Sequence, residues 1–341
     1  MSLASRTTLT RTAAVVLAGG LALTLTACGS GSKGSGDAGS SGGAVKVGLI
    51  TKTDTNPFFV KMKEGAQKAA KENNVTLSTA AGKFDGDNAG QIAAIENMVA
   101  AGVKGILITP SDSKAILPAI KKARDKGVVV IALDSPTDPT DGTDALFATN
   151  NEKAGQLIGQ YAKAAMAGKS AKIATLDLAP GVAVGQLRHD GFLEGFGIAE
   201  GDPSVVCSQD TGGDQAKGQT AMENCLQKAP DINVVYTINE PAALGAYTAL
   251  KAKGREKDVL IVSVDGGCTG TQAVKDGKIA ATSQQYPLVM ASEGVKAVAE
   301  YAKSGVKPIG YTDTGVNLVT DKPQAGVEAK DTAYGLENCW G

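Results

Sequence analysis

The chain has 341 residues, of which 34 are basic and 35 acidic, so its formal net charge is −1. A balance this even argues against a polyanionic partner such as nucleic acid. Aromatic residues make up only 4% of the chain, whereas apolar residues make up 43% and glycines number 43. This composition is typical of short Val, Ile and Leu strands covered by Ala-rich helices.

The first 27 residues have the pattern of a secretory signal. Arg6 and Arg11 precede the apolar run Ala13–Leu25, and small residues follow it. The run is shorter than the about 20 apolar residues that span a bilayer. We therefore expect residues 1–27 to be an export signal rather than a membrane span.

The residues that follow predict an anchor. Leu-Thr-Ala-Cys at 25–28 resembles the lipobox of bacterial lipoproteins, in which the signal is cut before the cysteine and its sulfur carries a lipid. The resemblance implies lipidation at Cys28; an ordinary signal peptide with an incidental cysteine is the alternative. Residues 28–43 are mostly Gly and Ser, a flexible linker. The mature protein is then expected at the outer face of the cytoplasmic membrane, on the cell surface or in the periplasm.

The folded part, roughly 300 residues, alternates short apolar strands with helices. Asn56 and Pro57 are suited to the N-cap and first turn of the first helix. The expected strands of the first half are Val45–Thr51, Val75–Ala80, Gly105–Thr109, Val128–Leu133 and Ala145–Thr149. The expected helices of the first half are Pro57–Asn73, Asn88–Ala101, Ser113–Lys126 and Glu152–Ala167.

The same alternation restarts at Ala171. The expected strands of the second half are Ala171–Leu176, Val205–Ser208, Asn233–Ile238, Val259–Val264, Ala280–Gln284 and Thr314–Val319. The expected helices of the second half are Ala183–Phe196, Gln215–Lys228, Pro241–Ala252, Thr269–Asp276 and Leu288–Ser304.

This pattern predicts an α/β fold with two doubly wound parallel-sheet lobes. Strands that alternate with helices form βαβ units, and continuous apolar strands are covered on both faces. A TIM barrel is the main alternative. The break at Asp134–Ala145 and the restart at Ala171 argue against a single closed sheet.

Four cysteines besides Cys28 predict two disulfides in an exported chain, with three possible connectivities. We prefer Cys207–Cys225, which would join a strand to the next helix, and Cys268–Cys339, which would hold the C-terminal tail. Free buried thiols are the alternative. No spacing resembles a zinc site, since His189 is the only histidine.

Polar residues follow the predicted strands, where ligands of open α/β sheets bind. The candidates for ligand binding are Asn56, Phe58, Phe59, Asp134, Arg188, Asn239, Asp265 and Gln285. They include no histidine and no free nucleophile. Carboxylates, amides and a guanidinium suit the hydroxyls of a neutral polyol, and an aromatic ring can cover the apolar face of a sugar.

Five motifs carry a family resemblance. They are Thr-Asn-Pro-Phe-Phe at 55–59, Arg-His-Asp-Gly at 188–191, Asn-Glu at 239–240, Val-Asp-Gly at 264–266 and Gln-Tyr-Pro at 285–287. Together they resemble the substrate-binding proteins of bacterial sugar ABC transporters, in the ribose/galactose-binding class (periplasmic binding protein type 1). The segment Leu49–Gly65 and the ending Glu-Asn-Cys-Trp-Gly look most like fructose-binding members, which implies fructose as the ligand.

The resemblance implies a role for each candidate. Asn56 and Asp134 would bind hydroxyls from the first lobe, with Phe58 or Phe59 against the ring. The second lobe would bind hydroxyls through Arg188, Asn239 and Asp265, and Gln285 would do so near the hinge.

The sequence departs from the family pattern in two places. Ser135 follows Asp134 where ribose-binding relatives have an arginine, and the loop 210–214 lacks an aromatic residue. The losses argue against ribose itself.

The resemblance also implies a three-segment hinge, with chain crossings near Thr149, Gln285 and Thr314. The N-terminal lobe is expected over 44–149 plus 286–314, and the C-terminal lobe over 150–285 plus 315–341. Closure around the sugar would present both lobes to a membrane permease that works with an ATPase. The protein is expected to be a monomer without a cofactor.

Several alternatives remain open. The ligand could be another pentose, a polyol or an inositol, and the protein could be a sugar sensor or chemotaxis ligand carrier. A glycoside hydrolase would use Asp134 and Asp265 on either side of a bond; we expect a binding protein rather than an enzyme. Asp138, Asp141 and Asp144 do not have the spacing of a calcium loop, so we expect no metal and a solvated acidic turn.

Overall fold

The computed structural model describes residues 44–341. The expected signal segment, the lipidation residue Cys28 and the linker 28–43 lie outside the described residues. Within residues 44–341, no helix combines the length and apolarity needed to cross a membrane.

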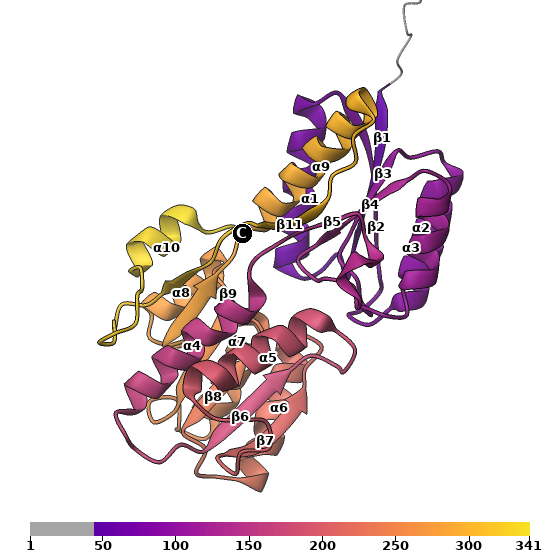
Figure 1. Cartoon of the computed structure of the whole chain (residues 1–341). Coiled ribbons are helices and arrows are strands. Elements are labelled where there is room, and N and C mark those ends of the chain that lie inside the picture. Colours follow the sequence, from indigo (N-terminus) through magenta and orange to yellow (C-terminus); the bar gives the residue numbers. More distant parts are fainter. Residues whose placement is uncertain (1–43) are drawn as a thin grey trace, which may run out of the picture. The chain divides into compact units, whose positions relative to one another are not determined.

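The first lobe is built on a parallel sheet of six strands in the order β11-β5-β4-β3-β1-β2 (Figure 1). Its strands are β1 (Val45–Thr51), β2 (Val75–Ala81), β3 (Gly105–Ile108), β4 (Val129–Leu133), β5 (Ala145–Ala148) and β11 (Gly310–Asp313). Its helices are α1 (Pro57–Glu72), α2 (Asn88–Ala100), α3 (Leu117–Asp125) and α9 (Pro287–Ser304), with a 3-10 turn η1 (Thr140–Gly142).

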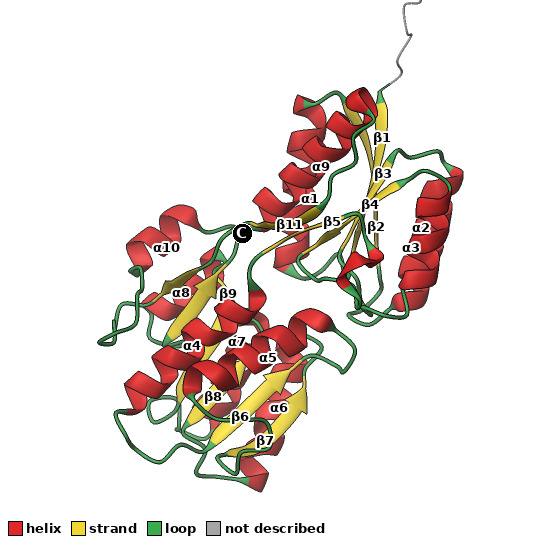
Figure 2. Cartoon of the chain, viewed as in Figure 1, coloured by secondary structure: helices red, strands yellow, loops and turns green. Residues whose placement is uncertain are grey.

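Helices cover both faces of this sheet (Figure 2). On one face α1 and α9 pack together over Val47, Leu49 and Ile131. On the other face α2 and α3 pack over Ile106 and Ile108. The strands are apolar on both sides because both faces are buried.

The second lobe repeats this arrangement with the sheet order β12-β10-β9-β8-β6-β7. Its strands are β6 (Ile173–Asp177), β7 (Val205–Asp210), β8 (Val234–Thr237), β9 (Leu260–Asp265), β10 (Ala281–Gln284) and β12 (Asn317–Val319). Its helices are α4 (Asn151–Met166), α5 (Ala183–Phe196), α6 (Gln215–Lys228), α7 (Glu240–Ala252), α8 (Cys268–Lys275) and α10 (Thr332–Asn338). All pairings are parallel except that between β10 and β12.

The expected fold class is confirmed. Two open sheets with helices on both faces exclude the TIM-barrel alternative for the described part of the chain. Each sheet has the doubly wound order in which the second strand lies outside the first. In each lobe, the carboxyl ends of the parallel strands meet at one edge, where a ligand site is expected.

The strand expected over Thr314–Val319 is shorter than predicted, and a strand that was not expected precedes it in the other sheet. β12 covers Asn317–Val319 and β11 covers Gly310–Asp313, so residues 310–319 contribute to both sheets. Gly315 between them has φ +94°, and its N–H donates to the Asp313 carboxylate at 2.9 Å. This turn ends β11 before the chain enters the other sheet, because a positive φ does not continue a strand.

Two helices also differ from expectation. The helix expected from Ser113 begins at Leu117, because the Asp112 carboxylate accepts from the N–H groups of Lys114 and Ala115 and forms a separate turn. Helix α10 was not expected from the sequence.

The chain passes between the two sheets three times, after β5, after β10 and after β11. Two of these passages bond to each other. Thr149 Oγ1 donates to Gly315 O at 3.1 Å, and Asn150 N–H donates to the Asp313 carboxylate at 3.3 Å. The passages therefore lie side by side, as the segments of a hinge do.

The structure contains the two disulfides that the sequence favours. Cys207 of β7 bonds to Cys225 of α6, and Cys268 of α8 bonds to Cys339, just after α10. The first clips a strand to the helix that covers it, and the second holds the C-terminal tail on α8.

The expected acidic turn is not simply solvated. The Asp144 side chain is buried, accepts from Val130 N–H, and forms ion pairs with Arg124 at 3.1 Å and Lys307 at 3.3 Å. Asp144 therefore connects the turn to β4 and α3. These contacts account for the carboxylate at this position, and no bound ligand is needed to explain it. Among residues 44–341, no group of three or more His, Cys, Asp or Glu side chains is placed to hold a metal ion.

Candidate functional site

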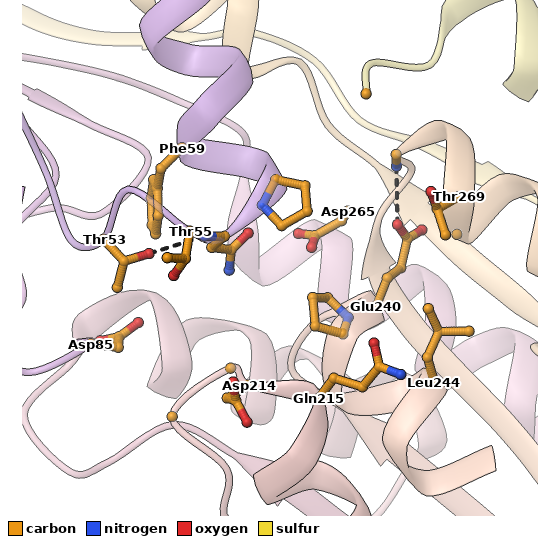
Figure 3. Close-up of a pocket in the computed structure, with 18 of the residues that line it drawn as sticks. Thr53, Thr55, Phe59, Asp85, Asp214, Gln215, Glu240, Leu244, Asp265 and Thr269 are labelled. Atoms are coloured by element: carbon orange, nitrogen blue, oxygen red, sulfur yellow. Dashed lines mark hydrogen bonds between the residues drawn. The ribbon is translucent and has the colours of Figure 1, made fainter. Parts of the chain in front are cut away.

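All eight candidate side chains from the sequence line one small cavity of about 30 Å³. Its other lining residues are Lys52, Asp85, Leu178, Val184 and Ile238. A wider cleft of about 490 Å³ shares Asn56, Phe59, Asp85 and Asp265 with it. Figure 3 shows Phe59 and Asp85 of the first lobe in this cleft together with Asp265 and Glu240 of the second. The wider cleft, not the small cavity, has the volume of an ordinary small-molecule site.

Arg188 of α5 lines the small cavity and faces an aspartate of each lobe. Its Nη2 is 3.4 Å from Asp134 Oδ1 in the first lobe, and its Nη1 is 3.8 Å from Asp265 Oδ1 in the second. Nη1 also donates to Ile238 O at 3.1 Å, and Nε donates to Asn151 Oδ1 at 2.8 Å. One guanidinium thus faces both aspartates while its remaining N–H groups are held by the second lobe.

Asp134 and Asp265 occupy equivalent places in the two lobes. Asp134 follows β4 and has φ +61°, and Asp265 ends β9 and has φ +144°. Non-glycine residues rarely adopt positive φ, and such strain concentrates at functional sites. The backbone turns both carboxylates toward the cavity rather than along the strands.

Gln285 joins the Asp265 side of the cavity. Its Nε2 donates to Asp265 Oδ1 at 2.8 Å, whereas its Oε1 is buried without a hydrogen-bond partner. A buried amide oxygen left unpaired costs free energy. This oxygen is available to accept from a ligand hydroxyl.

Asn56 and Asn239 both cap helices. Asn56 Oδ1 accepts from Phe58 N–H at 3.0 Å at the start of α1. Asn239 Oδ1 accepts from Ala242 N–H at 3.1 Å at the start of α7, and its Nδ2 donates to Gly213 O at 3.0 Å. Each amide keeps unused hydrogen-bonding capacity on the cavity side, because an amide can make four hydrogen bonds. Capping and ligand binding are therefore compatible at both residues.

Phe58 and Phe59 are core residues that also line the cavity. Both are buried in the α1–α9 core of the first lobe, and their rings meet edge to face with centroids 5.4 Å apart. Phe59 lines the wider cleft as well. The core fixes the rings from behind, so each can offer a rigid apolar surface to a sugar.

Lys52 and Asp85 were not expected from the sequence. Lys52 follows β1, is 1% exposed, and its Nζ lies 3.8 Å from Asp85 Oδ2. The position of Lys52 directly after the first strand was the available signal. The structure brings a positive charge from the first lobe to the cavity.

Asn151 and Glu240 support the site from behind. Asn151 Nδ2 donates to Asp134 O at 3.1 Å, so Asn151 links Asp134 to Arg188. The Glu240 carboxylate accepts from the N–H groups of Gly266 and Gly267, at 2.8 and 3.0 Å, and from Thr282 Oγ1 at 2.8 Å. Glu240 therefore holds the turn that aims Asp265. Asn-Glu at 239–240 was a motif in the sequence, but only Asn239 was a candidate.

Burial raises the pKa values of three acidic groups at the site. Burial raises the pKa of Asp265, and the Arg188 charge and the Gln285 hydrogen bond oppose the rise. Burial and the Asp265 charge raise the pKa of Glu240. Burial also raises the pKa of Asp85, with Lys52 opposing. Burial is therefore the main cause of the raised pKa at each of these carboxyl groups.

Comparisons with known proteins show the family of the chain. Residues 47–306 match the sequence profile of the periplasmic binding protein domain. The ribose import binding protein of Bacillus subtilis (strain 168) is 35% identical over 241 residues, 71% of this chain and 76% of the relative. The galactofuranose-binding protein of Escherichia coli (strain K12) is 30% identical over 264 residues, 74% of this chain and 80% of the relative.

Solved structures lead to the same family. An ABC transporter periplasmic solute-binding protein from Actinobacillus succinogenes 130z, with bound D-allose, superposes with a TM-score of 0.71 and 28% identity. The match covers 80% of this chain and 96% of that one. These relatives are binding proteins rather than enzymes, as the sequence predicted for this chain. The chain therefore belongs to the periplasmic binding protein family.

Proposed function

We propose that the protein is the solute-binding component of an ABC importer and captures a neutral monosaccharide between its two lobes. The observation that carries this proposal is the shared cavity, in which Arg188 faces Asp134 of one lobe and Asp265 of the other. Hydrogen bonds between hydroxyls and charged groups contribute about 1.5–3 kcal/mol each, so such a site discriminates against a ligand that lacks one hydroxyl.

The proposed ligand is fructose. The proposal rests on the resemblance of Leu49–Gly65 and of the C-terminal ending to fructose-binding members. The named ligands of the relatives, ribose, allose and galactofuranose, are the competing candidates. Ser135 in place of an arginine argues against ribose, because a bidentate donor to the ring hydroxyls is missing there.

The proposed mechanism is hinge closure. We assign 44–149 and 286–314 to one lobe and 150–285 and 315–341 to the other, and the three passages between the sheets serve as the hinge. A sugar held by both lobes stabilises the closed form by its differential affinity for that form. Because the small cavity is far below the size of an ordinary ligand site, the sugar requires the lobes to part before it enters.

The proposed location is the outer face of the cytoplasmic membrane. Lipidation at Cys28 and the linker 28–43 would keep the protein, as a monomer, close to its permease and raise its effective concentration there. Globomycin, which blocks lipoprotein signal cleavage, should then cause the unprocessed form to accumulate. Processing that globomycin leaves unchanged would contradict the anchor.

The function is tested by calorimetric titration of the full chain with D-fructose, D-ribose, D-allose and D-galactofuranose. We expect one sugar to bind, and Asp265→Ala to abolish binding because the Asp265 carboxylate, which accepts from Gln285, is the proposed partner of a ligand hydroxyl. Asp276→Ala, which removes an exposed carboxylate paired with Lys278, is the matched control and should bind normally. Binding of a sugar other than fructose would change the proposed ligand and leave the proposed function standing. Binding of no sugar would overturn the proposed function.

A further inference from the structure

The chain leaves α10 at Cys339, and the next two residues, Trp340 and Gly341, line the cleft. The backbone of Trp340 is fixed to the second lobe, because Cys268 N–H donates to Trp340 O at 2.9 Å and Trp340 forms a parallel bridge with Gly267. One residue earlier, the Cys268–Cys339 disulfide attaches the same segment covalently to α8. Trp340 and Gly341 both line the 490 Å³ cleft.

The Trp340 side chain joins the first lobe. It is buried among the core residues of α1 and α9, and its ring lies edge to face against Phe58 with centroids 5.4 Å apart. Its Nε1 donates to Gln285 O at 2.8 Å. A segment tied to the second lobe thus contacts one cavity residue of the first lobe and one at the hinge.

We infer that Trp340 is a positioning residue for ligand binding, and that the Cys268–Cys339 disulfide holds it in place. The inference rests on the proposed function. Phe58 is the ring that would face the sugar beside Phe59, and Gln285 bonds Asp265 through its side chain. Trp340 restrains both, so that less motion has to be lost when the ligand binds.

The chain provides its own control and its own reporter. The Cys207–Cys225 disulfide lies in the same lobe and clips β7 to α6, and neither cysteine lines the cavity or the cleft. Trp340 is the only tryptophan of the chain, so tryptophan fluorescence reports on this one position.

The first experiment compares Cys268→Ala/Cys339→Ala with Cys207→Ala/Cys225→Ala in the full chain. Without any sugar, we expect the tryptophan emission of the first variant to shift to the red as Trp340 becomes solvated, and that of the second to stay unchanged. With D-fructose and D-ribose as probes, affinity should fall about tenfold in the first variant and less than about threefold in the second. Equal spectra and equal affinities would overturn the inference.

The second experiment separates positioning from mere stability. Trp340→Phe keeps an aromatic ring against Phe58 but loses the hydrogen bond to Gln285, and Trp340→Ala loses both. Affinity measured well below the melting temperature should fall in that order, and a double-mutant cycle with Phe58→Leu should show coupling. A lower melting temperature with unchanged affinity would show a structural role only. If no sugar binds the wild-type chain, the proposed function fails; if sugar binds wild type and Trp340 variants alike, only this inference fails.

Discussion

Arg188 and Lys52 are the two cations of the cavity, and they are held in different ways. Arg188 donates hydrogen bonds to Asn151 and to Ile238 O and forms ion pairs with two aspartates, so its orientation is fixed before a ligand arrives. The Nζ of Lys52 has its nearest carboxylate, that of Asp85, at 3.8 Å. A hydroxyl oxygen that comes within hydrogen-bonding distance would therefore stabilise this buried ammonium, whose present partner is distant.

Lys52→Met should therefore weaken sugar binding about tenfold or more, the worth of one charge-assisted hydrogen bond. Lys46→Met is the matched control, since Lys46 is an exposed lysine on the same strand β1 whose Nζ donates to Ala101 O. Isothermal titration calorimetry measures both affinities. Equal affinities for the two variants would remove Lys52 from the site.

His189 makes stability depend on pH. Its Nδ1 lies 2.9 Å from Asp177 and its Nε2 3.1 Å from Glu200, and the Asp177 hydrogen bond, opposed by burial, raises the pKa of His189 to about 9. Because this value exceeds that of the unfolded chain, the pairing stabilises the fold fully below pH about 6.5 and is lost as pH rises through about 9.

We expect the free energy of unfolding of the wild-type chain to fall by about 2 kcal/mol between these limits on account of His189, with the exposed Glu200 contributing least. His189→Gln should flatten that part of the curve. Urea denaturation at a series of pH values measures it. A His189→Gln curve parallel to wild type from pH about 6.5 to 9 would contradict the assignment.

At the scale of elements, the packing of α4 against α5 sets the position of Arg188. A Cβ at Gly155 of α4 would lie 2.2 Å from Arg188 O, and one at Gly191 of α5 would lie 2.1 Å from Glu152 O. Only glycine permits the two backbones to approach this closely. The close approach brings Arg188 within reach of Asn151 at the start of α4.

Gly155→Ala should push α5 away and move Arg188 from Asp134. Overpacking of this kind costs about 1–3 kcal/mol of stability. Gly195→Ala makes an equally close contact, 2.2 Å to Gln156 O, but at the far end of α5. We expect both variants to lose stability, and only Gly155→Ala to lose about tenfold or more in sugar affinity. Similar sugar affinities of the two variants would show that this helix contact does not set the position of Arg188.

The elements also show what a sequence can predict. Helix α5, Ala183–Phe196, and helix α6, Gln215–Lys228, have the predicted limits, because local signals mark them: Gly197 with φ +83° ends α5, and the Asp214 side chain caps α6. The division of 310–319 between two sheets depends on which strands lie nearby, β5 in one case and β10 in the other. Lys52 was missed for the same reason: its burial depends on Asp85, which is distant in sequence.

At the scale of the whole molecule, the two lobes place equivalent residues opposite each other. Asp134 follows β4 and Asp265 ends β9, which hold the same place in their sheets. The five motifs that resemble a known family contain seven of the eight candidates, and Asp134 was found because it follows a predicted strand. All eight line the cavity, because the carboxyl ends of parallel strands are where this fold binds ligands. The contacts between the lobes are harder to predict from the sequence, because they join loops and no periodic sequence pattern predicts loop contacts.

One such contact joins the lobes at Ser113. Its N–H donates to Gly181 O at 3.1 Å, and its Oγ accepts from Ala183 N–H at 3.1 Å. Ser113 follows β3 in the first lobe, whereas Gly181 and Ala183 precede or begin α5 in the second. The Ser113 hydroxyl therefore bonds the first lobe to the second, and under the proposed hinge mechanism this bond would favour the closed form.

Ser113→Ala should shift the ligand-free protein toward the open form. One hydrogen bond contributes about 1 kcal/mol, so the apparent sugar affinity should fall up to about fivefold. Ser111→Ala is the matched control, because the Ser111 hydroxyl is buried without a partner and lies in the first lobe. Small-angle scattering should show the radius of gyration of ligand-free Ser113→Ala above that of Ser111→Ala, and the two should converge when sugar is saturating. A ligand-free radius unchanged by Ser113→Ala would mean that the hinge, rather than this contact, sets the degree of closure.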